Sequence, residues 1–283
     1  MESWHRDRLS VTQAAFVESR FSGVRFVKDL SWDLVDSAVL EVEHGERRYV
    51  IKAAGPANHH IGREADAHES FTGIWASQGR APRLVHTDRS LNLLVTEYLE
   101  GCLVEGGAAE YADDTYRQAG QLLRAFHAQT VRMDPQYEAA ATAKAMAWLE
   151  KPHRIEEAAV ERARAVLAAY RPEPATVVPT HGDWQPRNWL IRGTELRVID
   201  FGRFEFRPAM TDFCRLALQQ WRSSPALEDA FFEGYGSDPR EGRLWNLMLL
   251  REAVSTSAWA FHVGDHKFEE QGHRMLVDAL ANF

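Results

Sequence analysis

The stretch HGDWQPRNWL, residues 181–190, and the later LRVIDFGRF, residues 196–204, decide how this chain is interpreted. Asp183 and Asn188 lie five positions apart, and a second aspartate, Asp200, ends an apolar run. Short β-rich runs flank the first stretch, so we expect a loop on a rigid base, with the His-Gly-Asp turn offering Asp183 to a cleft. The spacing indicates that Asp183 and Asn188 act together and that a neighbouring strand brings Asp200 to them.

These three polar side chains suit phosphoryl transfer. An exposed Asp183 can accept a proton from a substrate hydroxyl, and Asn188 offers an uncharged oxygen ligand for a hard cation such as Mg²⁺. Asp200, followed by Phe-Gly where the backbone can turn sharply, would complete a magnesium pair. Phosphoryl transfer needs such a base together with metal ligands that neutralise phosphate charge. The alternative is an Asp and an Asn that only satisfy turn backbone.

The composition is that of an ordinary globular protein with an acidic excess. Of the 283 residues, 45% are hydrophobic and 26% are charged, and the formal net charge is −8. No run rich in Lys or Arg is present, which argues against a nucleic-acid partner. The acidic balance is compatible with a cationic small-molecule partner, and it gives only weak support to that idea.

The cysteines and the N-terminal sequence predict a cytoplasmic protein that does not enter a membrane. Cys102 and Cys214 belong to no CxxC pattern and lie near no histidine cluster, so we expect buried thiols in a reducing compartment. The first residues, MESWHRDRLS, contain no apolar signal core, and no apolar run approaches the length of a membrane span.

Hydrophobic period and turn residues divide the chain into a sheet-rich first third and a mostly helical remainder. We expect strands at 24–30, 38–44, 47–54 and 91–99, and helices at 11–22 and 61–78. Later helices are expected at 113–129 and 152–170 and from Pro208 onward, with short strands at 177–180, 189–192 and 195–199. Glycines near residues 100–108 mark the boundary, which predicts an N-lobe of residues 1–100 and a C-lobe of residues 101–283. A cleft between two lobes is a common place for a ligand.

The motif HGDWQPRN followed by IDFG resembles the Brenner-type catalytic loop of aminoglycoside phosphotransferases and choline kinases. It is also similar to the HRDxxxxN and DFG elements of protein kinases. The resemblance implies a protein-kinase-like α+β fold, with a mainly antiparallel sheet in the N-lobe and a helical C-lobe. It makes Asp183 the catalytic residue and Asn188 and Asp200 the metal ligands. The wider run HGDWQPRNWL resembles most the phosphotransferases that inactivate tuberactinomycin antibiotics such as viomycin and capreomycin.

The resemblance extends over most of the chain. It implies that Lys52, in the strand YVIKAA, holds the nucleotide phosphates and that Glu64 is its ion-pair partner. The run TEYL, residues 96–99, falls at the expected hinge, where the Glu97 carbonyl and the Leu99 N–H would bind the adenine edge.

Three further positions match residues that support the catalytic loop. The matching residues are His127, His181 and Asp212. The chain also departs from protein kinases, because the loop LSWDLVDS lacks GxGxxG and no APE element follows IDFG. No GxxxxGK[ST] motif occurs, so a P-loop kinase is not expected.

Acceptor-binding residues are the least determined part of the site. Trp184 directly follows Asp183, so it is either a wall of the acceptor site or a packing residue. A cationic acceptor needs carboxylates, and we expect them first at Glu205, near Asp200, and then at Asp265, Glu269 and Glu270. Any helix surface carries such groups, and the alternative is a solvated acidic face.

The sequence thus predicts O-phosphorylation of a small-molecule hydroxyl, with ATP or GTP as donor and with Mg²⁺. The expected acceptor is a cationic antibiotic, a tuberactinomycin peptide first and an aminoglycoside second. Phosphorylation would add negative charge to a ligand that binds ribosomal RNA through positive charge. Two alternatives stay open: a metabolite kinase acting on choline, a sugar or homoserine, and a non-catalytic nucleotide-binding module. The oligomeric state is not predicted.

Overall fold

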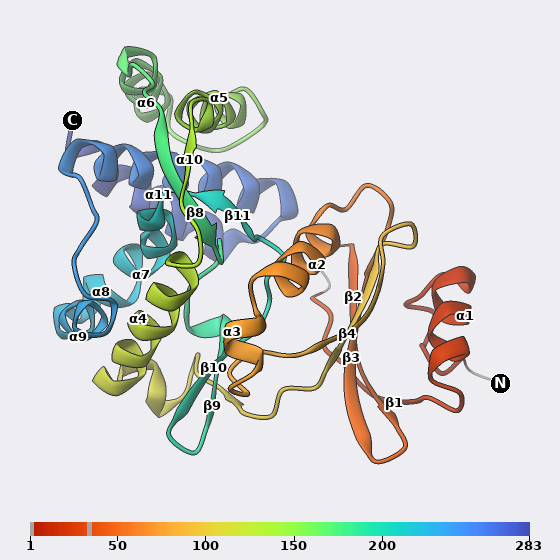
Figure 1. Cartoon of the computed structure of the whole chain (residues 1–283). Coiled ribbons are helices and arrows are strands. Elements are labelled where there is room, and N and C mark those ends of the chain that lie inside the picture. The colour runs from red at the N-terminus through yellow and green to blue at the C-terminus, as the bar shows by residue number, and fades with distance from the viewer. Residues whose placement is uncertain (1–2, 33–35) are drawn as a thin grey trace.

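The computed structural model describes residues 3–32 and 36–283 of the chain. An antiparallel sheet with few helices forms the first part, and the rest forms a larger, mostly helical body (Figure 1). Part of the loop LSWDLVDS lies outside the described residues, so the expectation about its missing glycine motif concerns the sequence alone.

Strands and helices alternate early in the chain, and helices predominate later. The strands are β1 (Arg25–Asp29), β2 (Ser37–His44), β3 (Arg47–Ala54), β4 (Leu84–Asp88), β5 (Leu93–Glu97), β6 (Cys102–Leu103), β7 (Arg132–Asp134), β8 (Ala175–Thr180), β9 (Trp189–Arg192), β10 (Glu195–Val198) and β11 (Glu205–Arg207). The α-helices are α1 (Val11–Arg20), α2 (His60–Ser70), α3 (Gly73–Ala76), α4 (Asp113–His127), α5 (Tyr137–Leu149), α6 (Glu157–Ala169), α7 (Cys214–Leu218), α8 (Gln220–Ser223), α9 (Pro225–Tyr235), α10 (Gly242–Val263) and α11 (His266–Leu280). The 3-10 helices are η1 (Ala108–Tyr111), η2 (Pro186–Asn188) and η3 (Ala209–Phe213).

One face of the large sheet packs against α1 and the other faces α2, and Lys52 lies on the second face. Its strand order is β1-β2-β3-β5-β4, and every neighbouring pair is antiparallel. Successive side chains of a strand point to opposite faces, so Ile51 packs with Val17 of α1 while Lys52 points toward α2. Helix α1 begins with the capping box that its sequence suggests, in which Ser10 and Gln13 bond each other's backbone N–H.

The loop of residues 181–188 leaves β8 and enters the hairpin of β9 and β10. In that hairpin Trp189 pairs with Val198, and the Ile199 N–H donates to the Asn188 carbonyl at 3.0 Å. This register places Asn188 beside the end of β10, where Asp200 follows. The neighbouring strand therefore brings in Asp200 as the sequence suggests.

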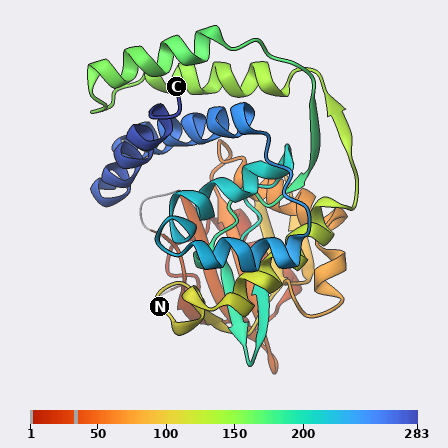
Figure 2. The ribbon, with the colours of Figure 1, turned by 90° about the vertical axis from the view of Figure 1, so that its left-hand side faces the viewer.

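The helical body is built on two hydrophobic cores. One joins α4 and α9 with the aromatic residues of the loop region, and Trp75 of α3 stacks on Phe126 there, with ring centroids 4.5 Å apart. The other holds α5, α6, α10 and α11 together, and Figure 2 shows α5 and α6 as a pair of long helices alongside α10 and α11. Within the described residues, no helix has both the length and the apolar character needed to cross a membrane.

Two expected helices differ from the structure, and a further helix was not expected. The helix predicted at 61–78 ends at Ser70 and resumes as α3, and the Phe71 and Thr72 N–H groups both donate to the Ala67 carbonyl at the break. The helix predicted at 152–170 begins only at Glu157. Helix α5 was not predicted, because its alanine-rich sequence YEAAATAKAMAWL has high helix propensity but a weak amphipathic pattern.

Candidate active site

Lys52 and Glu64 form a buried ion pair between β3 and α2. The Lys52 Nζ lies 2.8 and 2.9 Å from the two Glu64 carboxylate oxygens and 3.1 Å from Asp200 Oδ1. Burial opposes ionisation of Glu64, but the positive charge of Lys52 outweighs it and lowers the pKa of Glu64 to about 2. Burial likewise opposes the charge of Lys52, and Asp200 and Glu64 outweigh it and raise its pKa. The pair therefore stays ionised at neutral pH.

We expect the Lys52–Glu64 pair to stabilise the protein less in acid. The pKa of Glu64 is lower in the folded chain than its ordinary value of 4.5, so its contribution is complete above about pH 4.5 and is lost as the pH falls toward 2. The loss is on the order of 2–3 kcal/mol. Urea unfolding of the wild type and Glu64→Gln at pH 6 and pH 3 measures it, and the gap between the two proteins should narrow at pH 3. A gap that does not change would contradict this assignment; His68, 3.8 Å from Glu64, is retained in both proteins.

Asp183 is buried and is held by four side chains. Gln185 donates to Oδ1 at 2.6 Å and Asn188 donates to Oδ2 at 2.9 Å. Arg215 lies 2.9 Å from Oδ1 and Arg187 2.6 Å from Oδ2. Burial raises the pKa of Asp183, but the charges of Arg215 and Arg187 lower it well below its usual range. Asp183 is therefore a charged, fixed hydrogen-bond acceptor.

The turn that carries Asp183 is anchored from below by Asp212. The Asp212 carboxylate accepts the backbone N–H of His181 at 2.9 Å and that of Gly182 at 2.6 Å. His127 Nε2 lies 3.0 Å from the same carboxylate, and the Tyr235 hydroxyl lies 2.9 Å from His127 Nδ1. The three residues that the resemblance assigns to support are thus brought together under the loop, and all three are buried.

The conformation and surroundings of Gly182 require glycine between His181 and Asp183. Its φ is +81°, in the left-handed region, and a Cβ atom built on it would lie 2.2 Å from the Arg203 carbonyl oxygen. No side chain fits in that space, so only glycine allows the segment after Asp200 to approach the loop this closely.

Asn188 contacts Asp183, and the backbone bond between Ile199 and Asn188 places the segment that carries Asp200 beside it. Asn188 donates through Nδ2 to the Asp183 carbonyl and carboxylate, which turns its amide oxygen away from those bonds. Asp200 has a φ of +66°, a conformation that Asp tolerates better than most residues, and its side chain is 49% exposed. Within residues 3–32 and 36–283, no group of three or more His, Cys, Asp or Glu side chains could hold a metal ion. An Asn–Asp pair fits Mg²⁺, which keeps waters and substrate phosphates as its other ligands.

Glu97 and Leu99 lie where the sheet passes into the helical body. Glu97 ends β5 and its N–H donates to the Arg83 carbonyl at 2.9 Å, while the Tyr98 N–H donates to the Arg48 carbonyl at 3.0 Å. The connection is therefore fixed to the sheet by backbone bonds. Its binding to a nucleotide stays a prediction.

Trp184 lies in the core, which favours the packing interpretation over the acceptor wall. It has no exposed surface, and its ring contacts Trp189 and His181 with centroids 5.4 Å apart in each case, and Trp75 at 5.8 Å. The same residue is also among those that line the cavity beside Asp183.

The predicted acceptor carboxylates do not gather at one site. Asp265 accepts the Phe268 N–H at 3.0 Å as the cap of α11, and Glu269 is buried in an ion pair with Arg154. Glu270 is exposed. Glu205 of β11 lies opposite Thr180 of β8, but its carboxylate is paired with Arg207 at 2.7 Å. None of these four residues lines the cavity beside Asp183, so this cavity gives no support to an acidic acceptor pocket built from them, and their role in acceptor binding stays a prediction.

A cavity of about 380 Å³ opens beside Asp183. Its walls come from α2, α5, the 181–188 loop, the segment after Asp200, α7, α10 and α11. The histidine, arginine, lysine and acidic residues that line it are His59, His60, Arg63, Lys144, Arg203, Arg207, Asp212, Arg215, Arg251 and Glu252. Sequence reasoning missed these arginines, although Arg203 directly follows the DFG segment and Arg215 lies three residues after Asp212.

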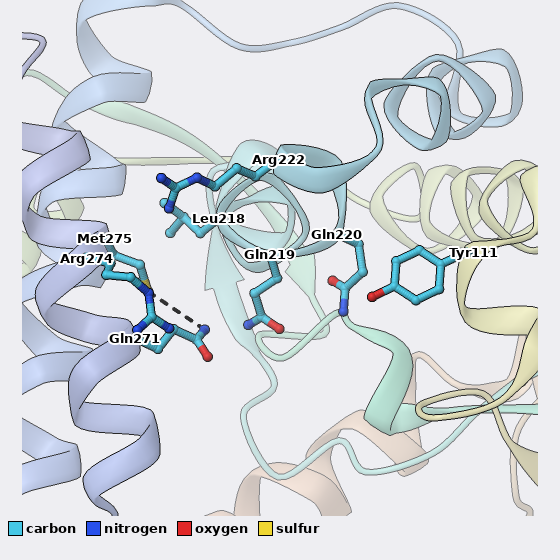
Figure 3. A pocket seen from close by; sticks show the side chains of 8 residues that line it. All are labelled: Tyr111, Leu218, Gln219, Gln220, Arg222, Gln271, Arg274 and Met275. Carbon is cyan, nitrogen blue, oxygen red and sulfur yellow. Dashed lines mark hydrogen bonds between the residues drawn. The ribbon is translucent and has the colours of Figure 1, made fainter.

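A second cavity, of about 320 Å³, lies between η1, the α7–α8 corner and α11. Figure 3 shows the glutamine and arginine side chains that line it, with Gln219 and Gln220 in its centre. Gln219 also lies 3.4 Å from Gln185, the residue that bonds Asp183. None of the residues predicted for the site lines this second cavity.

The family of this chain follows from comparison with protein-family models. Residues 30–245 match the model of the phosphotransferase enzyme family, known as APH. The chain therefore belongs to this family, and it is a small-molecule phosphotransferase with a hydroxyl group as acceptor. A search of curated proteins gives no significant match.

Solved structures show the same fold at low sequence identity. Aminoglycoside phosphotransferase APH(4)-Ia matches with a TM-score of 0.71 and 14% identity, over 95% of this chain and 97% of its own. Choline kinase LicA from Streptococcus pneumoniae matches with a TM-score of 0.69 and 15% identity, over 95% and 97%. Macrolide 2'-phosphotransferase MphH from Brachybacterium faecium matches with a TM-score of 0.63 and 18% identity, over 92% and 96%. The predicted protein-kinase-like α+β fold is thereby confirmed.

Proposed function

We propose that this phosphotransferase moves the terminal phosphoryl group of ATP to a small-molecule hydroxyl held beside Asp183. The observation that carries the proposal is that two sets of contacts lie side by side. Lys52 binds Glu64 and Asp200, Asn188 binds Asp183, and the bond from the Ile199 N–H to the Asn188 carbonyl places Asn188 next to the segment that carries Asp200. Related folds have been solved with ADP and with AMP-PNP, which supports a nucleotide as the donor. In such a site most of the rate gain comes from positioning and charge neutralisation.

Asp183 has the orienting role in this proposal. Arg215 and Arg187 stabilise its charged form, so it is a weak proton acceptor before the reaction begins. A hydroxyl that donates to the Asp183 carboxylate is directed toward the phosphorus, and its proton passes to the carboxylate only as the new P–O bond forms. The acceptor oxygen gains the phosphoryl group, and the bond between the bridging oxygen and the γ-phosphorus breaks to release ADP.

Lys52, Asn188 and Asp200 would hold the charged end of the nucleotide. Lys52 is fixed by Glu64, and its ammonium would supply positive charge to the phosphates of a bound nucleotide. Asn188 and Asp200 would hold Mg²⁺, which supplies neutralisation of phosphate charge when bound. Glu97 and Leu99 would bind the adenine edge through their backbone.

The acceptor has two candidate classes. The run HGDWQPRNWL supports an antibiotic, a tuberactinomycin or an aminoglycoside, and related folds include structures bound to hygromycin B and spectinomycin. A metabolite kinase is the second class, and the positive charge around the cavity beside Asp183 favours it over a cationic antibiotic. The non-catalytic alternative is disfavoured by the family and by the intact set of catalytic residues.

A coupled ADP-release assay tests the proposed function. The panel contains capreomycin, viomycin, hygromycin B, kanamycin, streptomycin, choline and homoserine, together with small alcohols that carry phosphate or carboxylate groups. We expect turnover with ATP on one chemical class, and loss of that turnover when EDTA removes Mg²⁺. Turnover that persists in EDTA would contradict the roles of Asn188 and Asp200. Absence of turnover on every acceptor would count against the transfer reaction.

A further inference from the structure

The cavity beside Asp183 is lined mainly by cations. Six Arg or Lys side chains line it, against two acidic ones, Asp212 and Glu252. Asp212 is already engaged with the backbone of the 181–188 loop and with His127. An aminoglycoside or a basic peptide would have to place its ammonium groups among these cations, and like charges in a partly desolvated site repel strongly.

Several of these cations have anionic partners. Arg215 bridges Asp183 and Glu252 at 2.9 and 3.0 Å. Arg251 pairs with the buried Glu138 at 2.7 Å. The cations in these pairs are neutralised within the protein and need no ligand.

The Glu205 carboxylate lies near two of these cations, but it is close enough for a short ion pair with only one of them. Arg207 lies 2.7 Å from its carboxylate, whereas Arg63 approaches it only to 3.5 Å. Arg63 therefore keeps donors available for a further acceptor.

Arg203 and Lys144 are left without partners. Neither side chain forms a hydrogen bond or an ion pair with another residue in the described ranges. Burial lowers the pKa of Arg203 and that of Lys144, and neighbouring arginines lower both further. The charges of Asp183 and Glu252 oppose this lowering for Arg203, and the charge of Glu205 opposes it for Lys144, but they do not outweigh it. An unpaired cation at a desolvated position is costly, and an anion bound there would remove that cost.

The two free cations reach the cavity from different elements. Arg203 follows Gly202 in the segment after Asp200, and its carbonyl packs on Gly182 beside Asp183. Lys144 belongs to the face of α5 that lines the cavity, on which residues 137, 141, 144 and 148 recur at helical spacing. Figure 2 shows α5 and α6 as an added layer beyond α10. An acceptor in this cavity would therefore have its hydroxyl near Asp183 and another of its groups within reach of α5.

We propose that the acceptor of this enzyme is a small alcohol carrying an anionic group, a phosphate or a carboxylate, which Arg203 and Lys144 bind with help from Arg63. The proposal rests on the proposed function and names the substrate class of the same site. It replaces a cationic acceptor by an anionic one, because the acidic residues expected to bind a cation lie elsewhere or are already paired. Guanidinium and ammonium groups together are the usual recognition elements for phosphate and carboxylate.

The same cations have a second possible source of phosphate, the terminal group of ATP. The test therefore uses enzyme saturated with AMP-PNP and Mg²⁺. Isothermal titration calorimetry then measures binding of glycerol 3-phosphate, D-glycerate and uncharged glycerol. We expect the two anionic probes to bind and glycerol not to bind, and Lys144→Gln and Arg203→Gln each to weaken anion binding about tenfold or more.

Lys28→Gln is the matched control, because Lys28 is an exposed lysine of β1 on the sheet. It removes the same charge and should leave anion binding unchanged. Equal anion affinity in the wild type and in both cavity variants would overturn the proposal. So would anion binding that disappears when AMP-PNP is bound, because the cations would then serve the nucleotide.

Failure of this proposal can be told apart from failure of the proposed function. ADP release on a cationic acceptor alone, abolished by Asp183→Asn, would reject the anionic acceptor and keep the phosphotransfer assignment. Anion binding that survives AMP-PNP and is lost in the two cavity variants, without ADP release on any panel member, would keep the anion site and reject the proposed reaction.

Discussion

Replacing Asp183 by asparagine is expected to lower kcat by roughly 10²–10⁴-fold while the affinity for AMP-PNP changes by no more than about twofold. Asparagine keeps the shape of the side chain but removes the negative charge and one acceptor. The substrate hydroxyl then loses the carboxylate that orients it, and no carboxylate is present to accept its proton. Lys52, Asn188 and Asp200, which would hold the nucleotide, keep their own contacts, so nucleotide binding should remain.

Two measurements separate this result from simple unfolding. The variant leaves Arg187 and Arg215 with a weaker partner, but Arg187 is about one third exposed and Arg215 keeps Glu252 at 3.0 Å. Thermal unfolding should therefore show a folded protein, and AMP-PNP titration should show a working nucleotide site. Asp229→Asn, at an exposed position of α9, is the control and should retain full turnover. Activity of Asp183→Asn close to the wild type would reject Asp183 as the catalytic residue.

The sequence places Lys52, Glu64, Asn188 and Asp200 because short-range geometry determines their positions. Asn188 and Asp200 flank one hairpin, and the pairing of Trp189 with Val198 brings them together. Lys52 and Glu64 belong to a strand and the helix that follows it, so a contact between them needs only one connection. Motif order was sufficient for these residues, although their catalytic roles stay predictions until they are tested.

The acceptor side could not be predicted in the same way. Its cavity takes residues from α2, α5, α7, α10 and α11, and the period of a helix does not show which distant element its polar face will meet. Glu269 illustrates the problem: it has the composition of a surface carboxylate but is 3% exposed and paired with Arg154. Helix α5, which supplies Lys144, was missed altogether because its alanine-rich sequence has little amphipathic pattern.

Removing the Arg215 side chain should be the most damaging single change to stability. Arg215 is buried, and its guanidinium joins Asp183 of the loop to Glu252 of α10. Arg215→Gln leaves the buried Asp183 carboxylate without one of its two charged partners, and breaking a buried pair in this way costs about 3–5 kcal/mol. Glu252 is more exposed, with 28% of its side chain accessible, so water compensates part of its loss. Urea unfolding at neutral pH measures the effect.

A double variant decides whether the cost comes from unpaired charge or from lost packing. If unpaired charge dominates, Arg215→Gln combined with Glu252→Gln should be more stable than the sum of the two single losses predicts, because the second change removes a carboxylate that has already lost its partner. If packing dominates, the two losses should simply add. Turnover gives an independent result, because Arg187 still holds Asp183 but only from one side. Removal of Arg215 should therefore lower kcat even under conditions in which the variant is fully folded, and a folded variant with wild-type kcat would show that Arg215 does not position Asp183.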